Sequence, residues 1–380
     1  MKVAMYSYQS DGIVEHKNND LIQPDICELV LGFGDREELE NKELYQSIRQ
    51  KFPNATILLN STAGEIFDTE VLNNSVSLVA INFEKTPIKC ASVNIKDFEN
   101  SFDAGIAMVN KLDQDNLRYI LVISDGGLVN GSELVRGIET VVQHKIPVTG
   151  GLAGDGTRFS STLVGLNDQP ENGIIAALGF YGDHIKIGHG SMGGWEMFGP
   201  ERKVTRSSSN QLFDIEGKNA LELYKAYLGK YADELPGSAL LFPLSVKLKE
   251  ASEPVVRTIL NIDEEAKSMT FAGDIPEGSE VRFMKANFDR LIDAASGAAG
   301  KTITETLNKN PKLALLVSCV GRKIILNNRV SEEVEAVAET LGSQTLLAGF
   351  YSYGEISPFN PKSKCELHNQ TMTITTFDED

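Results

Sequence analysis

Three short stretches of the chain place glycine beside an acidic residue at the end of a predicted strand: Ser61-Thr62-Ala63-Gly64-Glu65, Gly154-Asp155 and Gly354-Glu355. Glycine permits a positive φ angle and a close approach of the backbone to a ligand. Open α/β sheets bind their ligands beyond the carboxyl ends of the strands. We therefore predict that polar side chains gather there around a small molecule. The alternative, that each pair only makes a turn and caps the next element, stays open.

The predicted ligand-binding side chains suit a molecule that carries both signs of charge. Those at the three stretches are Ser61, Thr62, Glu65, Asp155, Tyr351, Tyr353 and Glu355. The acidic residues among them are expected to meet an ammonium group, and Arg322, which follows a strand end, is expected to meet a carboxylate. The two tyrosines would supply hydroxyl groups and apolar walls. We expect all these residues to share one cavity.

The cysteines and histidines offer two other chemistries. A nucleophilic Cys319 served by His368 is the arrangement of a thiol-dependent hydrolase, although a structural role is favoured for each of the four cysteines. A single histidine can be an axial ligand to haem iron, and the candidates are His189 and His368. The five histidines show no zinc spacing, so no metal site is expected.

Composition limits the partner classes. The 380-residue chain has 36 basic and 53 acidic side chains, for a net charge of −17. A nucleic-acid binder needs a basic stripe to displace counterions from phosphates, and an anionic membrane face would repel this chain. No apolar run approaches the about 20 residues of a membrane-spanning helix, and the N-terminus has no signal-peptide pattern. We expect a cytoplasmic protein that neither binds nucleic acid nor inserts into a membrane.

The same pattern recurs three times along the chain. Residues 122–127 and 316–321 are apolar runs that end in serine and glycine, each between two helical patterns. Each copy then reaches a glycine–acid pair and closes with an apolar strand, and a shorter copy begins at Leu29. We predict an α/β fold with mixed sheets covered by helices, built from repeated strand–helix–strand modules. The expected domains are 1–199 and 200–380, with residues 190–200 as a linker or a loop that closes over a pocket.

Several of these stretches resemble the signatures of FIST-domain sensory proteins. The matching residues are 61–66, 150–155, 349–356, 198–200 with 204–205, 217–221 and the tail 365–372. The resemblance covers nearly the whole chain, as an N-terminal and a C-terminal FIST half. Since His368 and Asn369 lie in the matching tail, they join the predicted ligand-binding residues.

This resemblance implies a signal-input module rather than an enzyme. FIST domains are proposed to bind small ligands, amino acids among them, and to act on histidine kinases, diguanylate cyclases or chemoreceptors; one subgroup carries haem and senses nitric oxide. We expect a sensor without a cofactor that binds a small ligand, such as an amino acid, and signals through a separate partner such as a histidine kinase or diguanylate cyclase. A hinge near Pro200 is expected to respond to binding. The alternatives are a haem-binding nitric oxide sensor, with His189 or His368 as the ligand, and a thiol- or carboxylate-dependent hydrolase.

Overall fold

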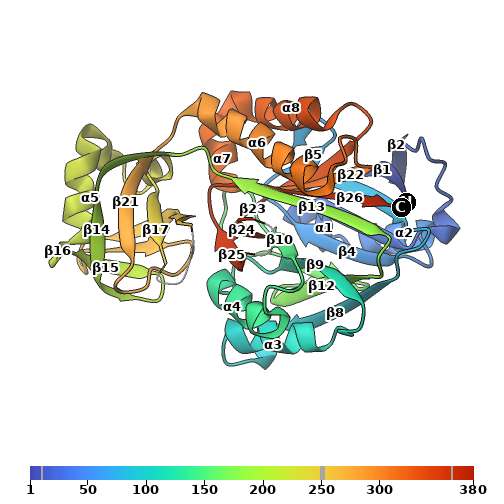
Figure 1. Cartoon of the computed structure of the whole chain (residues 1–380), viewed down its shortest axis with the longest axis horizontal. Helices are drawn as coiled ribbons and strands as arrows, with labels where there is room; N and C mark the ends of the chain where they lie inside the picture. The colour runs from blue at the N-terminus through green and yellow to red at the C-terminus, as the bar shows by residue number, and fades with distance from the viewer. Residues whose placement is uncertain (10–11, 249–252, 361–362) are drawn as a thin grey trace.

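Three similar α/β units pack together into one body, and a smaller domain lies beside it (Figure 1). The structure is a computed structural model that describes residues 1–9, 12–248, 253–360 and 363–380. The main strands of the first unit are β1 (Lys2–Gln9), β2 (Gly12–Lys17), β3 (Leu29–Gly34), β4 (Thr56–Ser61) and β7 (Val76–Asn82). Those of the second are β8 (Ile88–Asn94), β9 (Leu117–Ser124), β10 (Val148–Leu152) and β12 (Ile174–Tyr181). Those of the third are β13 (Ile185–Met192), β22 (Leu313–Cys319), β23 (Leu346–Ser352) and β26 (Met372–Glu379).

Each unit repeats the same order of four strands. The orders are β4-β3-β7-β1 in the first, β10-β9-β12-β8 in the second and β23-β22-β26-β13 in the third. In every unit the first two strands of the order are parallel, and the remaining pairs are antiparallel. The predicted α/β fold of mixed sheets built from repeated modules is therefore confirmed.

A short strand from each unit completes the sheet of another unit. From the first unit, β5 (Glu65–Phe67), extended by β6 (Glu70–Leu72), pairs with β23 of the third. From the third, β24 (Gly354–Pro358) and β25 (Cys365–His368) extend the second unit at β10. From the second, β11 (Val164–Leu166) pairs with β4 of the first. This exchange closes a ring, because each unit gives one strand segment and receives one.

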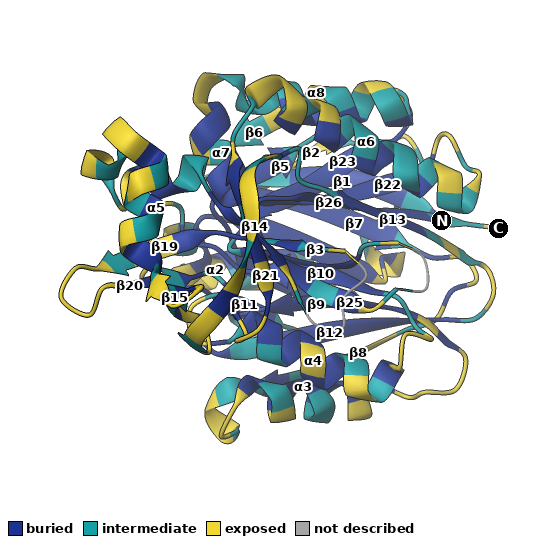
Figure 2. Ribbon diagram, turned by 60° about the vertical axis from the view of Figure 1, so that its left-hand side comes forward, coloured by how far each residue is buried: buried dark blue, intermediate teal, exposed yellow. Residues whose placement is uncertain are grey.

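Helices cover the outer faces of the three sheets, and the inner faces form one common core (Figure 2). The helices are α1 (Arg36–Glu40), α2 (Lys42–Lys51), α3 (Ser101–Asn110), α4 (Gly131–Val142), α6 (Phe288–Thr306), α7 (Val320–Leu326) and α8 (Val330–Leu341). On α4, Leu134, Ile138 and Val142 recur at helical spacing, and all three are buried against the second sheet. In the common core, the rings of Phe33 and Phe350 stack with centroids 5.2 Å apart, which joins the first unit to the third.

The smaller domain is inserted in the third unit, between β13 and the α6 helix that precedes β22 along the chain. Its strands are β14 (Glu196–Ser208), β15 (Gln211–Ile215), β16 (Lys218–Asn219), β17 (Leu244–Lys247), β18 (Val255–Arg257), β19 (Ile259–Asp263), β20 (Ser268–Phe271) and β21 (Glu280–Lys285), and its helix is α5 (Ala220–Leu228). These elements surround their own apolar core. The chain enters the domain after β13 and leaves it before α6, at the left of Figure 1.

The region around residue 200 differs from the expected linker. Residues 190–200 are mostly strand, because β13 ends at Met192 and β14 begins at Glu196 and continues to Ser208. The predicted boundary between residues 199 and 200 thus falls inside β14. The expected second domain, 200–380, contains both the small domain and most of the third unit. Among the described residues, no helix is both long and apolar enough to cross a membrane.

Candidate functional site

The carboxyl ends of the parallel strands meet where the three units join. The amide of Ala63 donates to Tyr351 O at 2.8 Å, which links the first unit to the third. The amide of Gly154 donates to Ser61 O at 2.9 Å, and that of Tyr353 donates to the carbonyl oxygen at the end of β10 at 3.2 Å. The turns that carry the three glycine–acid pairs are therefore in direct contact, as the repeat pattern led us to expect.

The acidic side chains of these turns make local hydrogen bonds. Glu65 accepts a 2.6 Å hydrogen bond from the hydroxyl of Thr62, and Glu355 accepts one of 2.6 Å from the hydroxyl of Ser352. Both hydroxyl groups come three residues before the acid, so the first and third units share the same motif. Thr371 also donates to Glu355, through its hydroxyl at 2.9 Å. The turn-forming role that the sequence left open is thus present in two of the three units.

Asp155 plays the corresponding part in the second unit with different partners. Its carboxylate accepts hydrogen bonds from Arg158 Nε at 2.7 Å and from the hydroxyl of Ser160 at 2.7 Å. Burial acts to raise the pKa of Asp155, but the hydrogen bonds from Ser160 and Arg158 outweigh it and lower the pKa below its usual value. Asp155 is therefore ionised and held in place by Arg158.

One cavity, which we call the charged cavity, lies against these turns and receives residues from all three units. Its volume is about 800 Å³. It is lined by Asp35, Thr62, Ala63, Gly64, Glu65, Val71, Asn73, Asn74, Gly156, Thr157, Arg158, Val320, Lys323, Ile324, Asn327 and Val330. Its four ionisable side chains are two acidic and two basic, so the wall carries both signs of charge.

The basic residues of the charged cavity are held by neighbouring units. Lys323 Nζ donates to Ala63 O at 2.6 Å and also to the side chain of Asn73. Because a lysine ammonium has three protons, one N–H is left for a further acceptor. Arg158 donates from Nη2 to Asp35 at 2.9 Å.

Glu65 is the more deeply buried of the two acidic groups of the charged cavity, at 1% exposed against 8% for Asp35. Burial raises the pKa of its carboxyl to about 7, although the hydrogen bonds from Thr62 and Ser75 and the charge of Lys323 act in the opposite direction. Burial also lowers the pKa of Lys323, whose charge Glu65 partly stabilises. Glu65 therefore titrates near neutral pH, where an arriving cation would keep it ionised.

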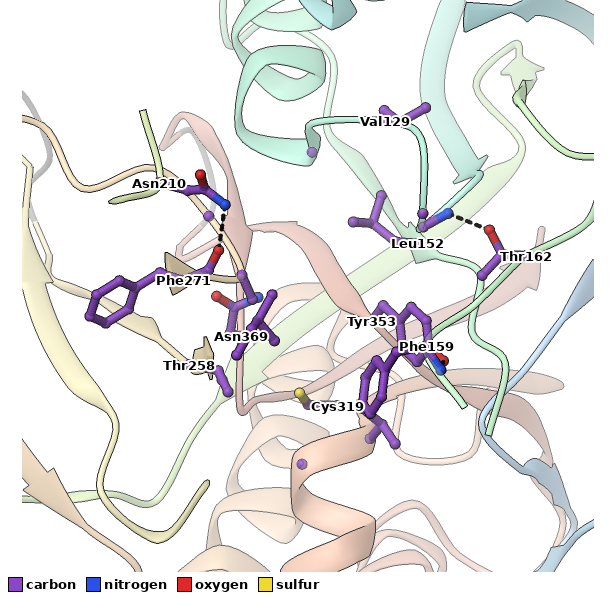
Figure 3. A pocket seen from close by; sticks show the side chains of 18 of the residues that line it. Val129, Leu152, Phe159, Thr162, Asn210, Thr258, Phe271, Cys319, Tyr353 and Asn369 are labelled. Carbon is purple, nitrogen blue, oxygen red and sulfur yellow. Dashed lines mark hydrogen bonds between the residues drawn. The ribbon is translucent and has the colours of Figure 1, made fainter. Parts of the chain in front are cut away.

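A second cavity, which we call the uncharged cavity, lies between the three-unit body and the small domain (Figure 3). Its volume is about 430 Å³. From the three-unit body it is lined by Gly126, Gly127, Leu128, Val129, Asn130, Gly131, Leu152, Phe159, Ser160, Ser161, Thr162, Cys319, Val320, Gly321, Tyr353 and Asn369. From the small domain it is lined by Asn210, Leu240, Thr258, Leu260, Phe271, Ala272 and Gly273. None of these described lining residues is charged.

The structure distributes the predicted site residues over three places. Thr62 and Glu65 line the charged cavity, whereas Tyr353 and Asn369 line the uncharged cavity. The others line neither of these two cavities: Ser61, Asp155, Arg322, Tyr351, Glu355 and His368. The expected single cavity shared by all of them is therefore not what the chain forms.

Arg322 is bound inside the third unit instead of facing a ligand. Its guanidinium group forms a buried ion pair with Glu333, at 2.7 Å from Nη2, and also donates to Gly193 O and Leu291 O, each at 2.7 Å. The hydroxyl of Tyr351 donates to the same Glu333 at 2.7 Å. These bonds occupy the groups that were predicted to bind a ligand carboxylate, because the strand end turns directly into α7 and faces Arg322 inward.

The two candidate haem ligands are enclosed by protein. His368 is buried, its Nε2 lies 2.8 Å from Ser357 O, and burial lowers its pKa to about 4. His189 lies in β13 with Nδ1 2.9 Å from Glu305. Neither ring lines the charged or the uncharged cavity, so these residues do not fit an axial role toward haem. In the part of the chain that is described, no three His, Cys, Asp or Glu side chains gather as a metal site.

Cys319 lines the uncharged cavity as a protonated thiol. Burial raises its pKa strongly, and the charge of Glu355 adds to the effect. A nucleophilic cysteine needs the opposite shift, since the thiolate is the reactive form. Burial likewise raises the pKa of Glu355 to about 8. Both groups are therefore stabilised in their neutral forms.

Several lining residues were not predicted from the sequence. Lys323 and Arg158 had a local signal, because each follows a strand-end turn by a few residues and is basic. Thr258 and Leu260 had none, since the small domain brings them to the uncharged cavity through contacts distant in sequence.

The fold is that of an α/β protein whose three units exchange strands and enclose small-molecule cavities at their strand ends. The chain belongs to the FIST family: the FIST N domain matches residues 28–218 and the FIST C domain matches residues 220–358. FIST domains are sensory domains. No curated protein matches the sequence. The chain is also similar to a crystal structure of cyanuric acid hydrolase from A. caulinodans, at 9% identity and a TM-score of 0.31, over 95% of this chain and 92% of that one.

Proposed function

We propose that this protein is a cytoplasmic sensor that binds an amino acid in the charged cavity and signals to a separate protein such as a histidine kinase or a diguanylate cyclase. The observation that carries the proposal is the pairing of charges in one cavity wall. Asp35 and Glu65 offer carboxylates to an ammonium group, and Lys323 and Arg158 offer cations to a carboxylate. A zwitterion satisfies both sets at once.

Glu65 and Lys323 have unused hydrogen-bonding capacity, which supports a ligand of this kind. Each oxygen of Glu65 accepts one hydrogen bond from the protein, from Thr62 and Ser75, and a carboxylate oxygen can accept a second. Lys323 donates two of its three N–H groups to Ala63 O and to the side chain of Asn73, which leaves the third for the ligand. The backbone and side-chain amides around Asn73 and Asn327 add neutral polar groups for the remainder of the ligand.

The position of the charged cavity suggests how binding would be transmitted. A bound amino acid would contact all three units, and it would add its interactions to the Lys323–Ala63 hydrogen bond between the third unit and the first. A ligand shifts an equilibrium only by its differential affinity for two arrangements. If the units move relative to one another, a ligand that contacts all three binds one arrangement more tightly than the other.

Calorimetry and thermal melting of the full chain with the common amino acids test the proposal. At a ligand concentration of 100 Kd, the free energy of unfolding should increase by about 2.7 kcal/mol. Matched amines and carboxylates that lack one of the two charges should give much smaller shifts. Lys323→Met should abolish the shift, whereas Lys247→Met on the small domain, whose ammonium is paired at 3.6 Å with Glu280, should not change it. The proposal fails if the single-charge analogues bind as tightly as the amino acids.

A further inference from the structure

The uncharged cavity contains buried polar atoms that the protein leaves without partners. Asn369 Oδ1 and Thr258 Oγ1 are buried and have no hydrogen-bond partner among the described residues. Asn369 Nδ2 donates to His368 O at 3.0 Å, so the oxygen end of the amide is the free one. Buried polar atoms without a partner are rare in folded proteins, because folding removes their hydrogen bonds to water and nothing replaces them. Both residues line the uncharged cavity, where a ligand can supply the missing bonds.

These two atoms come from the two bodies that enclose the cavity. Asn369 lies between β25 and β26 of the three-unit body, and Thr258 lies between β18 and β19 of the small domain. Figure 3 shows the two side chains next to each other on one side of the cavity. The neighbouring Arg257 donates from Nη1 to Leu367 O at 2.8 Å, which holds the two segments together. Both atoms therefore belong to one wall of the cavity, where the polar end of a ligand would lie.

The other side of the uncharged cavity is aromatic and apolar. The rings of Phe159 and Tyr353 stack with centroids 4.7 Å apart, and Figure 3 shows them across from Asn369. Phe159 is 52% exposed, Leu128 is 54% exposed and Leu260 is 48% exposed, and all three line this cavity. Large apolar side chains that stay exposed around one cavity indicate a binding surface.

We propose that the uncharged cavity is a second ligand site, for a neutral aromatic compound that carries a hydrogen-bond donor such as a carboxamide. The aromatic face would lie against Phe159 and Tyr353, and the donor would bond to Asn369 Oδ1 and Thr258 Oγ1. A charged ligand is disfavoured, because a buried charge without a partner is costly and the wall has no ionic side chain. The volume of about 430 Å³ lies in the range of small-molecule sites.

A ligand in this position joins the small domain to the three-unit body. The two bodies are already connected beside the cavity by the Arg136–Asp274 ion pair, with 2.9 Å between Nη1 and Oδ2. Asn130 Nδ2 donates to the same carboxylate at 3.2 Å. Occupancy of the cavity adds contacts to both bodies and holds the small domain in the arrangement seen here. This site does not depend on the amino-acid site proposed above.

The test uses the full chain and paired probes that differ in charge: benzamide against benzoate, and nicotinamide against nicotinate. Saturation-transfer NMR and calorimetry should detect binding of the amides and at least tenfold weaker binding of the carboxylates. Thr258→Val keeps the shape of the side chain and should weaken amide binding about tenfold, and Phe159→Ala, at an exposed position, should do the same. Thr304→Val on the exposed face of α6 is the matched control and should leave binding unchanged.

Two outcomes would overturn this site. One is that neither amide binds, or that the carboxylates bind equally well. The other is that Thr258→Val and Phe159→Ala, both folded by circular dichroism, bind the amides like the unmodified chain. Amino-acid binding in the charged cavity should be the same in Thr258→Val, so failure of one site is distinguishable from failure of the other.

Discussion

Lys323 Nζ lies against the backbone of Gly64: a Cβ atom added to this glycine would be 2.1 Å from the ammonium nitrogen. The same nitrogen donates to the carbonyl oxygen of Ala63. The ammonium of Lys323 can hold this position against the turn of the first unit because residue 64 has no side chain. This contact sets the position of a cation in the charged cavity.

Gly64→Ala should displace Lys323 and reduce amino-acid binding. The φ of Gly64 is +138°, which alanine adopts with strain, so we also expect a loss of about 1 kcal/mol or more in the free energy of unfolding. Gly156→Ala is the matched control in the same cavity, since its φ is +57° and an added Cβ meets no atom within 4 Å. Urea denaturation should show destabilisation in both variants. Only Gly64→Ala should lose amino-acid affinity, and equal affinities would show that Lys323 does not bind the ligand.

Amino-acid binding should weaken as the pH falls below about 7. The pKa of Glu65 is about 7 in the free protein, and an ammonium group bound beside it would lower that pKa. Binding below pH 7 must therefore release a proton from Glu65, and the dissociation constant should rise by up to tenfold per pH unit. Above pH 7 the carboxylate is already ionised, so this contribution is constant.

Calorimetry between pH 5.5 and 7.5 measures this dependence, with proton release detected by comparing buffers of different ionisation enthalpy. Glu65→Gln should bind more weakly at pH 7.5 and should lose the slope. A variant that keeps the slope of the unmodified protein would place the titrating group elsewhere.

The repeated modules, their mixed sheets and the contact between their glycine–acid turns could be predicted from sequence, because apolar periodicity and glycine positions are local signals. The exchange of β5, β11 and β24 among units could not, since these strands are three to five residues long and pair with residues far away in the chain. The linker expected at residues 190–200 differs from the structure for a related reason. The glycine-rich sequence is typical of a linker, but residues 190–192 of β13 pair with β26 and residues 196–198 of β14 pair with β21.

The candidate site was predicted in part because strand ends indicate where polar residues gather but not which way each side chain faces. Glu65 and Glu355 have equivalent positions in the repeat, yet Glu65 lines the charged cavity and Glu355 lines neither of the two cavities described above; its carboxylate accepts from Ser352 and Thr371. Arg322 and Lys323 are adjacent in sequence and lie on different sides of α7. Those differences depend on packing between units, which a single segment of sequence does not specify.

Arg322→Met should destabilise the fold severely, whereas Arg329→Met should not. The first change leaves the buried carboxylate of Glu333 without its cation, which typically costs about 3–5 kcal/mol. The second removes the ion pairs of Arg329 with Glu332 and Asp289, whose three side chains are 40%, 45% and 80% exposed, and each pair of this kind contributes about 0–1 kcal/mol. Urea denaturation gives both values. A small effect at Arg322 would mean that Glu333 is neutral in the variant and finds adequate partners in Ser318 and Tyr351.

Alkylation of the folded chain should distinguish a structural Cys319 from a catalytic one. Cys90 is exposed and accessible to a reagent, whereas Cys27, Cys319 and Cys365 are buried; burial raises the pKa of all four thiols. Because the thiolate is the form that reacts, iodoacetamide at pH 8 should modify one thiol in the folded protein and four after unfolding in urea. Cys90→Ser should leave the folded protein unmodified over the same time. Rapid modification of Cys319 in that variant, located by mass spectrometry, would mean that the cavity activates this thiol and would support the hydrolase alternative.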